Sequence, residues 1–289
     1  MTQVLVRHGW LFDESLRLGR FGFRVRSDVP GSPIPLQRLL GELSCPEPGS
    51  GERVYSLSVE ADDHASYALH FDDELVGRTS SGAWMFDRIM GDVTERALFQ
   101  SRDVLALHAG AVSLGGAGVL LPAPAGHGKS TLTCGLVVDG FDFLSDEAAL
   151  LSLDEPVVHP FPRPIALEPP SLEVLPGLRE RLQRTYGAFL RGRAFVAGED
   201  LRAGSAGESC RVRHVVLPQY VEGARTTLTQ LSRAEALVTM TAQCFNRRVI
   251  GGVAIEVLGR VLKGSTCHRL TVGDLPSAVA TIRELVSGG

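Results

Sequence analysis

The stretch VLLPAPAGHGKSTLTCGLVVDGFDFLSDE, residues 119–147, decides the fold of this chain. An apolar run leads into a loop of small residues, a second apolar run follows the loop, and a third ends in two carboxylates. The segment 123–131 contains the phosphate-loop pattern GxxxxGK[ST], which it matches at every fixed position except the first, where Ala123 replaces glycine. A strand, this loop and a helix in succession predict an α/β fold that binds a nucleotide.

The residue types of the loop suit a triphosphate. Small residues let backbone N–H groups curl around the β- and γ-phosphates, and we expect Gly126 and Gly128 to adopt conformations or approaches that a Cβ would block. The following helix adds its positive end, Lys129 a positive charge, and Ser130 a ligand for Mg²⁺. The predicted binding set for ATP and Mg²⁺ is Ala125, Gly126, His127, Gly128, Lys129, Ser130 and Thr131. Within it, His127 is expected to be an exposed loop histidine.

Two adjacent carboxylates, Asp146 and Glu147, follow the next apolar run, 17 residues beyond Lys129. One short helix and a tight turn fill that gap, so a βαβ crossover would place the carboxylates at the sheet edge that carries the phosphate loop. We expect Asp146 to orient or deprotonate an acceptor hydroxyl and Glu147 to hold Mg²⁺, directly or through water. The alternative is that both carboxylates cap the turn that follows.

Other candidate site residues are open to two interpretations. His108 lies in a predicted strand, 105–114, which a Gly-Gly turn joins to 117–124 as a hairpin; it is either a core histidine or an active-site residue. Arg163, between two prolines, would either stabilise charge on a transferred phosphoryl group or lie on the surface. The arginines within 179–209 are consistent with either a mobile lid or a solvated loop. We favour the solvated loop for Arg191, Arg193 and Arg202.

The rest of the sequence suggests two parts. Residues 1–95 are β-rich, with strands predicted over 4–9, 21–25, 54–61 and 66–71 and a connecting helix over 89–103. Residues 96–289 would form the catalytic domain. Within it, we expect a mostly extended segment over 155–178. A helix is predicted over 232–246, with Ser232 and Glu235 in a capping box and Asn246 as C-cap. A kinked helix is predicted over 248–264, and a strand over 267–273 before a final helix.

Composition excludes several classes of function. The 29 basic and 33 acidic residues give a formal net charge of −4, which offers nothing to attract nucleic acid or an anionic membrane. The five cysteines contain no CxxC pair, which argues against a disulfide framework or a structural zinc site. The sequence shows no signal peptide and no apolar run of membrane-spanning length. We therefore expect a cytoplasmic protein.

At this point the residues resemble a known family. The segment LHAGAVSLGGAGVLLPAPAGHGKSTLTCGLVVDGFDFLSDE, residues 107–147, is similar to the catalytic segment of HPr serine kinase/phosphorylase, and closer still to HPr-kinase-related kinases of bacterial peptide and exopolysaccharide gene cassettes. The segments HPFPRPIAL and CHRLTVGDLPSAVATI also fit. The resemblance implies a P-loop kinase core related to phosphoenolpyruvate carboxykinase. It implies that His108, Lys129, Ser130, Asp146 and Glu147 are site residues, with Asp146 as the catalytic carboxylate.

The chain departs from that family at Ala123, where the family has glycine, and at Glu147, where it has a second aspartate. Its later phosphorylase signature is absent, so we expect no phosphorylase activity. The predicted reaction is transfer of the ATP γ-phosphoryl group to a hydroxyl, in the first place a serine of a peptide or small protein, and relatives of HPr kinase suggest a homo-oligomer. The alternatives are a small-molecule kinase, with the N-terminal part supplying the acceptor pocket, and a non-catalytic nucleotide-binding regulatory module.

Overall fold

The computed structural model describes residues 9–30, 34–45, 53–59, 66–99, 101–175, 177–186 and 194–288. These form a mixed α/β structure with three sheets. The strand predicted over 4–9 lies, apart from Gly9, outside the described residues, as do Arg191 and Arg193.

The N-terminal part is a five-stranded sheet in the order β1-β2-β3-β4-β5. Its strands β2 and β3 run parallel, and the other neighbours run antiparallel. The strands are β1 Phe12–Leu18, β2 Phe21–Ser27, β3 Arg53–Val59, β4 Tyr67–Phe71 and β5 Glu74–Thr79. Helix α1, Leu36–Leu40, and a 3-10 helix, Gly41–Leu43, complete this part. Strands β2, β3 and β4 overlap predicted strands, whereas β1 and β5 were not among them.

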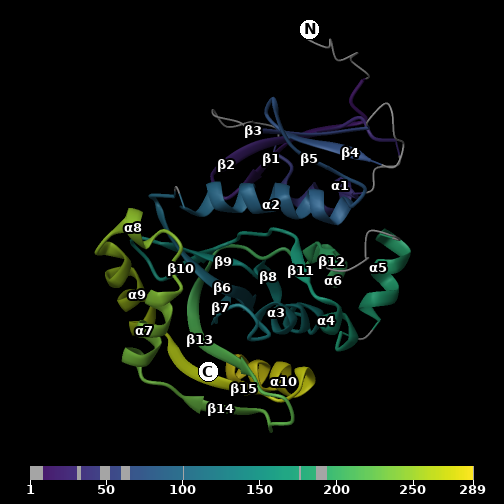
Figure 1. The fold of residues 1–289 in the computed structure, drawn as a ribbon. Helices are drawn as coiled ribbons and strands as arrows, with labels where there is room; N and C mark the ends of the chain where they lie inside the picture. The colour runs from purple at the N-terminus through teal and green to yellow at the C-terminus, as the bar shows by residue number, and fades with distance from the viewer. Residues whose placement is uncertain are drawn as a thin grey trace.

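A long helix, α2 (Gly82–Phe99), lies between this sheet and the rest of the molecule (Figure 1). It begins seven residues before the helix predicted from position 89, because the Ser81 hydroxyl accepts a hydrogen bond from the Trp84 N–H and caps its first turn. The buried side chains of α2 belong to one hydrophobic core that continues from the N-terminal sheet into the larger part of the molecule. There the Phe86 ring meets Phe195 edge-on at 4.9 Å. The division at residue 95 stays a prediction.

The larger sheet has eight strands in the order β10-β9-β6-β7-β13-β15-β14, with β8 paired to β6. Strands β7, β13 and β15 run parallel, and the other pairings are antiparallel. The strands are β6 Val104–Leu114, β7 Ala117–Pro122, β8 Asp142–Ser145, β9 Ala148–Ser152, β10 Val157–His159, β13 Cys210–Tyr220, β14 Thr227–Gln230 and β15 Thr266–Val272. The predicted hairpin is confirmed as β6 and β7, joined at Gly115 and Gly116.

The crossover from β7 through α3 (Lys129–Val138) to β8 positions the candidate site. Both strands pair antiparallel to β6, one on each side of it, so they point in the same direction. Strand β7 ends at Pro122 before the phosphate loop, and β8 ends at Ser145 before the two carboxylates. The predicted meeting of the loop and the carboxylates at one sheet edge is therefore confirmed.

The proline-rich segment and the predicted lid form more structure than expected. Strand β11 (Ile165–Leu167) pairs with β12 (Ala194–Val196) as a separate two-stranded sheet. Helix α4, Pro169–Glu173, starts with proline at its first positions, where a missing N–H is harmless. Helices α5 (Leu178–Tyr186) and α6 (Gly198–Leu201) follow.

The prediction that Arg202 lies in a lid or a solvated loop is wrong. Its guanidinium donates to the carbonyl oxygens of Val137 and Phe141, at 3.2 and 2.9 Å, and to the Asp142 carboxylate at 2.9 Å. These acceptors lie at the end of α3 and the start of β8, so Arg202 stabilises the turn between the two elements. A carbonyl cluster left by a helix end is a favourable place for a cation, but the sequence does not show which arginine reaches it.

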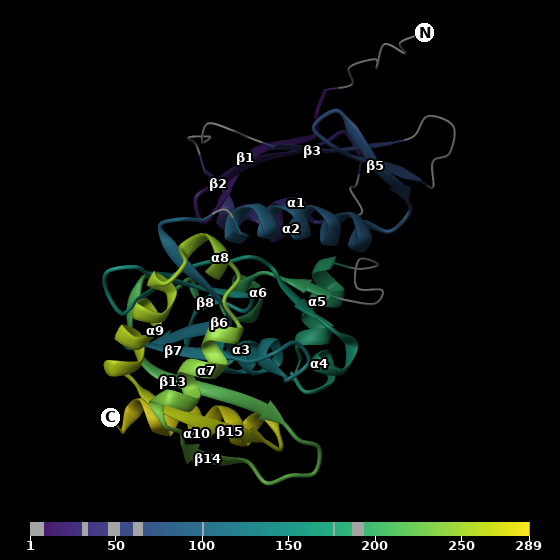
Figure 2. The ribbon, with the colours of Figure 1, turned by 60° about the vertical axis from the view of Figure 1, so that its left-hand side comes forward.

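Helices cover both faces of the larger sheet (Figure 2). Helices α3 and α10 (Leu275–Ser287) contribute buried residues to one core, and α7 (Arg233–Ala242) and α9 (Val253–Lys263) to the other. The predicted capping box at Ser232 is confirmed. The helix predicted over 248–264 is instead two, α8 (Arg247–Ile250) and α9, separated at Gly251 and Gly252.

The predicted helix 232–246 ends at Ala242, because its last four residues dock along β6. Strand β7 pairs with β6 only from Ala109 onward, so the first half of β6 has an open edge on that side. Residues 243–246 fill this edge, with a bridge between Leu107 and Cys244. Asn246 does not cap α7. It is 1% exposed, accepts from the Ala106 N–H and donates to the Ser101 and Val104 carbonyls.

We expect Asn246→Ala to lower the free energy of unfolding by roughly 2–3 kcal/mol, because it leaves buried backbone groups of β6 without partners. Urea unfolding followed by circular dichroism measures the effect. Gln230→Ala, which truncates an exposed amide side chain on β14, is the matched control and should change stability by less than about 0.5 kcal/mol. Equal behaviour of the two variants would contradict the anchoring role of Asn246.

Candidate active site

The phosphate loop joins the end of β7 to the start of α3. Gly126 and Gly128 have φ angles of 82° and 80°, in the left-handed region that favours glycine, as the sequence predicts. Ala123 is buried and has no positive φ, which explains why the usual first glycine is dispensable here. Gly128 is the N-cap of α3, and no side chain caps that helix. Its first backbone N–H groups are therefore available to an anion.

Lys129 turns back from the first turn of α3 toward β6. Its Nζ donates to His108 Nε2 at 2.8 Å and lies 3.4 Å from the Ala123 carbonyl oxygen. The residue is only 6% exposed. Burial lowers the pKa of Lys129, and the nearby carboxylates of Glu147 and Asp146 act in the opposite direction. The structure thus holds an ammonium group in a largely desolvated place where a phosphate would compensate it.

His108 lines the cavity from β6, and its catalytic role stays a prediction. Its Nε2 also lies 4.0 Å from Glu147 Oε1, and its Nδ1 lies 3.2 Å from Gln243 Oε1. Burial and then the charge of Lys129 lower its pKa below the ordinary 6.5. At neutral pH the imidazole is therefore uncharged and can accept a hydrogen bond from the lysine.

Asp146 is 4% exposed, and its carboxylate hydrogen-bonds to the side chain of Ser130. Its Oδ1 atom is buried and has no hydrogen-bond partner among the described residues. Burial raises the pKa of Asp146 to about 6, partly offset by the positive charge of Arg163. A buried carboxylate oxygen without a partner, beside a serine hydroxyl, fits a hard cation.

Glu147 and Arg163 form the opposite side of the site. The Arg163 Nη1 atom lies 3.8 Å from Glu147 Oε2 and donates to Thr94 Oγ1 on α2 at 3.1 Å. The Arg163 side chain is 12% exposed, so it is not a surface arginine. Its Nε atom is buried without a partner among the described residues. The site therefore presents a second cation to the space above the phosphate loop.

These side chains surround a cavity of about 560 Å³. Of the predicted site residues, it is lined by His108, Ala125, Gly126, Gly128, Lys129, Ser130, Thr131, Glu147 and Arg163. The predicted site residues Asp146 and His127 do not line the cavity. Helix α2 adds Asp87 and Gly91, and the segment from β11 into α4 adds Ala166, Glu168 and Ser171.

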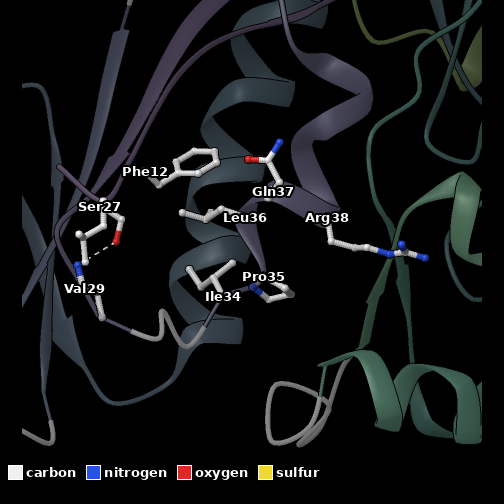
Figure 3. Close-up of a pocket in the computed structure, with 9 residues that line it drawn as sticks. Phe12, Ser27, Val29, Ile34, Pro35, Leu36, Gln37 and Arg38 are labelled. Carbon is white, nitrogen blue, oxygen red and sulfur yellow. Dashed lines mark hydrogen bonds between the residues drawn. The ribbon is translucent and has the colours of Figure 1, made fainter.

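A second cavity, of about 620 Å³, lies on the other side of the phosphate loop. It shares Gly126, Gly128, Thr131 and Ser171 with the first, and the Thr131 hydroxyl donates to Ser171 Oγ at 2.8 Å between them. Its remaining walls are mostly apolar: Leu132, Pro170, Val174, Tyr220, Val272, Leu275 and Pro276, with Gly273 and Asp274. A third cavity, of about 450 Å³, lies in the N-terminal part beside Phe12, Ile34 and Leu36, with none of the predicted site residues (Figure 3).

Sequence reasoning missed Gln243, Asp87 and Thr94. Gln243 approaches His108 across 135 residues of chain, and Thr94 reaches Arg163 across 69. No local pattern marks such residues, because they enter the site only when α7 and α2 pack against the larger sheet. A single polar residue on or beside a helix gives no sign of a site before its partner in the folded protein is known.

The donor set is compatible with Mg²⁺. Among the described residues, no group of three or more His, Cys, Asp or Glu side chains could hold a metal ion. Mg²⁺ in nucleotide sites needs no such cage, since one or two protein oxygens and the phosphates suffice. Ser130 Oγ and the Asp146 carboxylate supply two such oxygens.

No helix in the described part of the chain combines the length and the apolar character that crossing a membrane requires.

No protein-family model matches this sequence, and no curated protein matches it. Among solved structures, the chain is similar to one described as "Structure of the Hpr(Ser) kinase/phosphatase from Coxiella burnetii". The two share 12% sequence identity and a TM-score of 0.32, over 64% of this chain and 99% of that chain. A likeness at this TM-score carries no argument, so the functional proposal rests on the site itself.

The chain has two lysines, Lys129 and the exposed Lys263, which allow a matched test of the site's electrostatics. We expect Lys129→Met to raise the pKa of His108, because the substitution removes a positive charge that lowers it. Lys263→Met should leave that pKa unchanged. An NMR titration of the imidazole signals, with His108 assigned by its loss in His108→Asn, measures both. An unchanged or lower pKa in Lys129→Met would contradict the contact between the two residues.

Proposed function

We propose that this chain is an ATP-dependent kinase that transfers the γ-phosphoryl group to a hydroxyl, in the first place a serine of a peptide or small protein. The observation that carries the proposal is one cavity in which Lys129, Arg163, Ser130 and Glu147 face the uncapped start of α3. Two cations and a helix N-terminus favour a polyphosphate, and a carboxylate beside them suits an incoming hydroxyl.

The two cavities that meet at the phosphate loop support a division of the substrates. The apolar walls contributed by Tyr220, Val272, Leu275 and Pro276 suit the base and sugar of the nucleotide. The triphosphate would pass over Gly126 and Gly128, at the uncapped start of α3. The polar cavity beyond, with Glu147 and Arg163, then remains for the γ-phosphate and the acceptor.

Each charged residue has a role that follows from its position. Lys129 binds the phosphates and exchanges its contact with His108 for one with a phosphate oxygen. Arg163 stabilises the negative charge on the transferred group, since Thr94 and Glu147 hold its guanidinium at the cavity wall. Ser130 and Asp146 would hold Mg²⁺, whose charge would offset that of the bound phosphates.

For the two carboxylates we propose roles that differ from the sequence-based prediction, in which Asp146 was the base and Glu147 the metal residue. The hydrogen bond from Ser130 to Asp146 and the burial of that carboxylate support a metal-organising role. Glu147 lines the cavity, where an acceptor hydroxyl could approach it, and this supports its role as the residue that orients or deprotonates the hydroxyl. The nearby Arg163 keeps Glu147 in place.

One observation favours a small-molecule acceptor as the second candidate. Helix α2 of the N-terminal part contributes Asp87 and Gly91 to the wall of the cavity and so covers part of it. A partly covered cavity suits a compact acceptor, whereas a peptide needs an open path. A purely regulatory nucleotide-binding module would not need Arg163 and Glu147 beside the loop.

A phosphotransfer assay with γ-labelled ATP and Mg²⁺ in a lysate of the native host tests the proposal. Wild type should label an acceptor, a protein or peptide for the first candidate and a small metabolite for the second. Glu147→Gln should bind Mg²⁺·ATP normally and lose transfer by about 100-fold or more, as expected on removal of a general base. ADP release without a labelled acceptor would contradict the kinase proposal.

Asp146→Asn is the matched comparison for the roles of the carboxylates. We expect it to require a much higher Mg²⁺ concentration for nucleotide binding. In wild type, that requirement should rise as the pH falls below about 6, because protonation of Asp146 competes with the metal; the variant should lack this dependence on Asp146. If Asp146→Asn binds Mg²⁺·ATP like wild type and only transfer is lost, Asp146 is the base and our division is wrong.

A further inference from the structure

We propose that Gln243 is a positioning residue that holds His108 in the neutral form protonated on Nδ1, and so presents Nε2 as an acceptor to Lys129. This role deepens the proposed kinase function and rests on it only for its catalytic consequence. The proton arrangement itself is a property of the protein without substrate.

The backbone places Gln243 beside His108. Where β7 stops pairing with β6, residues 243–246 take over the open edge of β6. The His108 N–H donates to the Gln243 carbonyl at 2.8 Å, and the Phe245 N–H donates to the Ala106 carbonyl at 2.9 Å. The side chain of Asn246 fastens the end of this segment. The phosphate loop leaves the sheet at the place where this segment docks, so the segment has a fixed position relative to Lys129.

The donors and acceptors allow one consistent assignment of the imidazole protons. A lysine ammonium can only donate, so His108 Nε2, 2.8 Å from Nζ, must carry a lone pair. The proton of the neutral ring is then on Nδ1, and it needs an acceptor. Gln243 Oε1 lies 3.2 Å away and supplies it. An amide is suited to this task because it accepts the hydrogen bond without adding a charge.

The surroundings of His108 show why the neutral amide matters. The charged groups that face the ring are Lys129, from α3, and Glu147, which follows β8. The Phe245 ring lies against the imidazole, with centroids 5.4 Å apart. A carboxylate in place of the amide would favour a doubly protonated ring, which could no longer accept from Lys129 and would repel it. The amide therefore keeps the acceptor for Lys129 in place, which orients the ammonium toward the phosphate loop.

Two substitutions test the proposal. Gln243→Met keeps the side-chain length and removes the acceptor, so the Nδ1–H form should lose part of its preference over the Nε2–H form, while the contact with Lys129 still favours it. Gln243→Glu keeps an acceptor and adds a charge, so it should raise the pKa of His108. Cys244→Ser is the control, because its side chain points back to the Met240 carbonyl and the backbone docking is unchanged; it should leave both properties as in wild type.

The measurement is ¹⁵N NMR of the imidazole nitrogens of His108 in the full chain without nucleotide, followed over pH. The expected result is an Nδ1-protonated ring in wild type and Cys244→Ser, a shift toward Nε2 protonation in Gln243→Met, and a higher pKa in Gln243→Glu. ATP binding should weaken about three- to ten-fold in Gln243→Met, the effect of one hydrogen bond.

A wild-type ring protonated on Nε2, or a Gln243→Met ring identical to wild type, would overturn the proposal. If Gln243→Met does not fold, the pKa of His108 in Gln243→Glu decides, and an unchanged value overturns it. Because the NMR result involves no ATP and no acceptor, it stands or falls separately from the kinase assay. The expected spectra together with absent phosphotransfer would reject the kinase function and retain the positioning of His108.

Discussion

The ammonium group of Lys129, buried at the start of α3, is the constraint around which the site is arranged. Helix α3 lies so close to β6 that a Cβ on Gly110 would come within 2.5 Å of Thr133 Oγ1 and 3.4 Å of Lys129 Cγ. A cation in such a place needs partners, because its burial is unfavourable. The neutral ring of His108 accepts its hydrogen bond, and the carboxylates of Glu147 and Asp146 offset its charge. A bound triphosphate would complete this compensation.

The same constraint connects parts of the chain that are distant in sequence. Residues 243–246 fix His108 from the side of α7, and Thr94 on α2 fixes Arg163. The N-terminal sheet reaches the site through α2, which shares one continuous core with the larger part and adds Asp87 to the cavity. Through α2, the N-terminal part therefore supplies part of the wall of the cavity.

The elements around the phosphate loop were predictable from the sequence because they depend on neighbours along the chain. The glycines with positive φ, the hairpin of β6 and β7, and the placement of Asp146 and Glu147 at the loop's edge all follow from local patterns and a short crossover. The contacts of Arg202, Gln243 and Asn246 were not predictable. Each depends on a partner more than 50 residues away in the sequence. Asn246, which was expected to cap a helix, instead binds backbone groups of β6 that β7 leaves unpaired.

The most direct test of the account is a calorimetric comparison of ATP and adenosine binding, with Mg²⁺, to wild type, Lys129→Met and Lys263→Met. The account predicts that ATP binds far more tightly than adenosine to wild type. It also predicts that Lys129→Met weakens ATP by roughly 10- to 100-fold, the effect of a charge-assisted hydrogen bond, while adenosine binding is unchanged. Lys263→Met should match wild type. Equal ATP affinity in the two lysine variants would contradict a phosphate site built around Lys129.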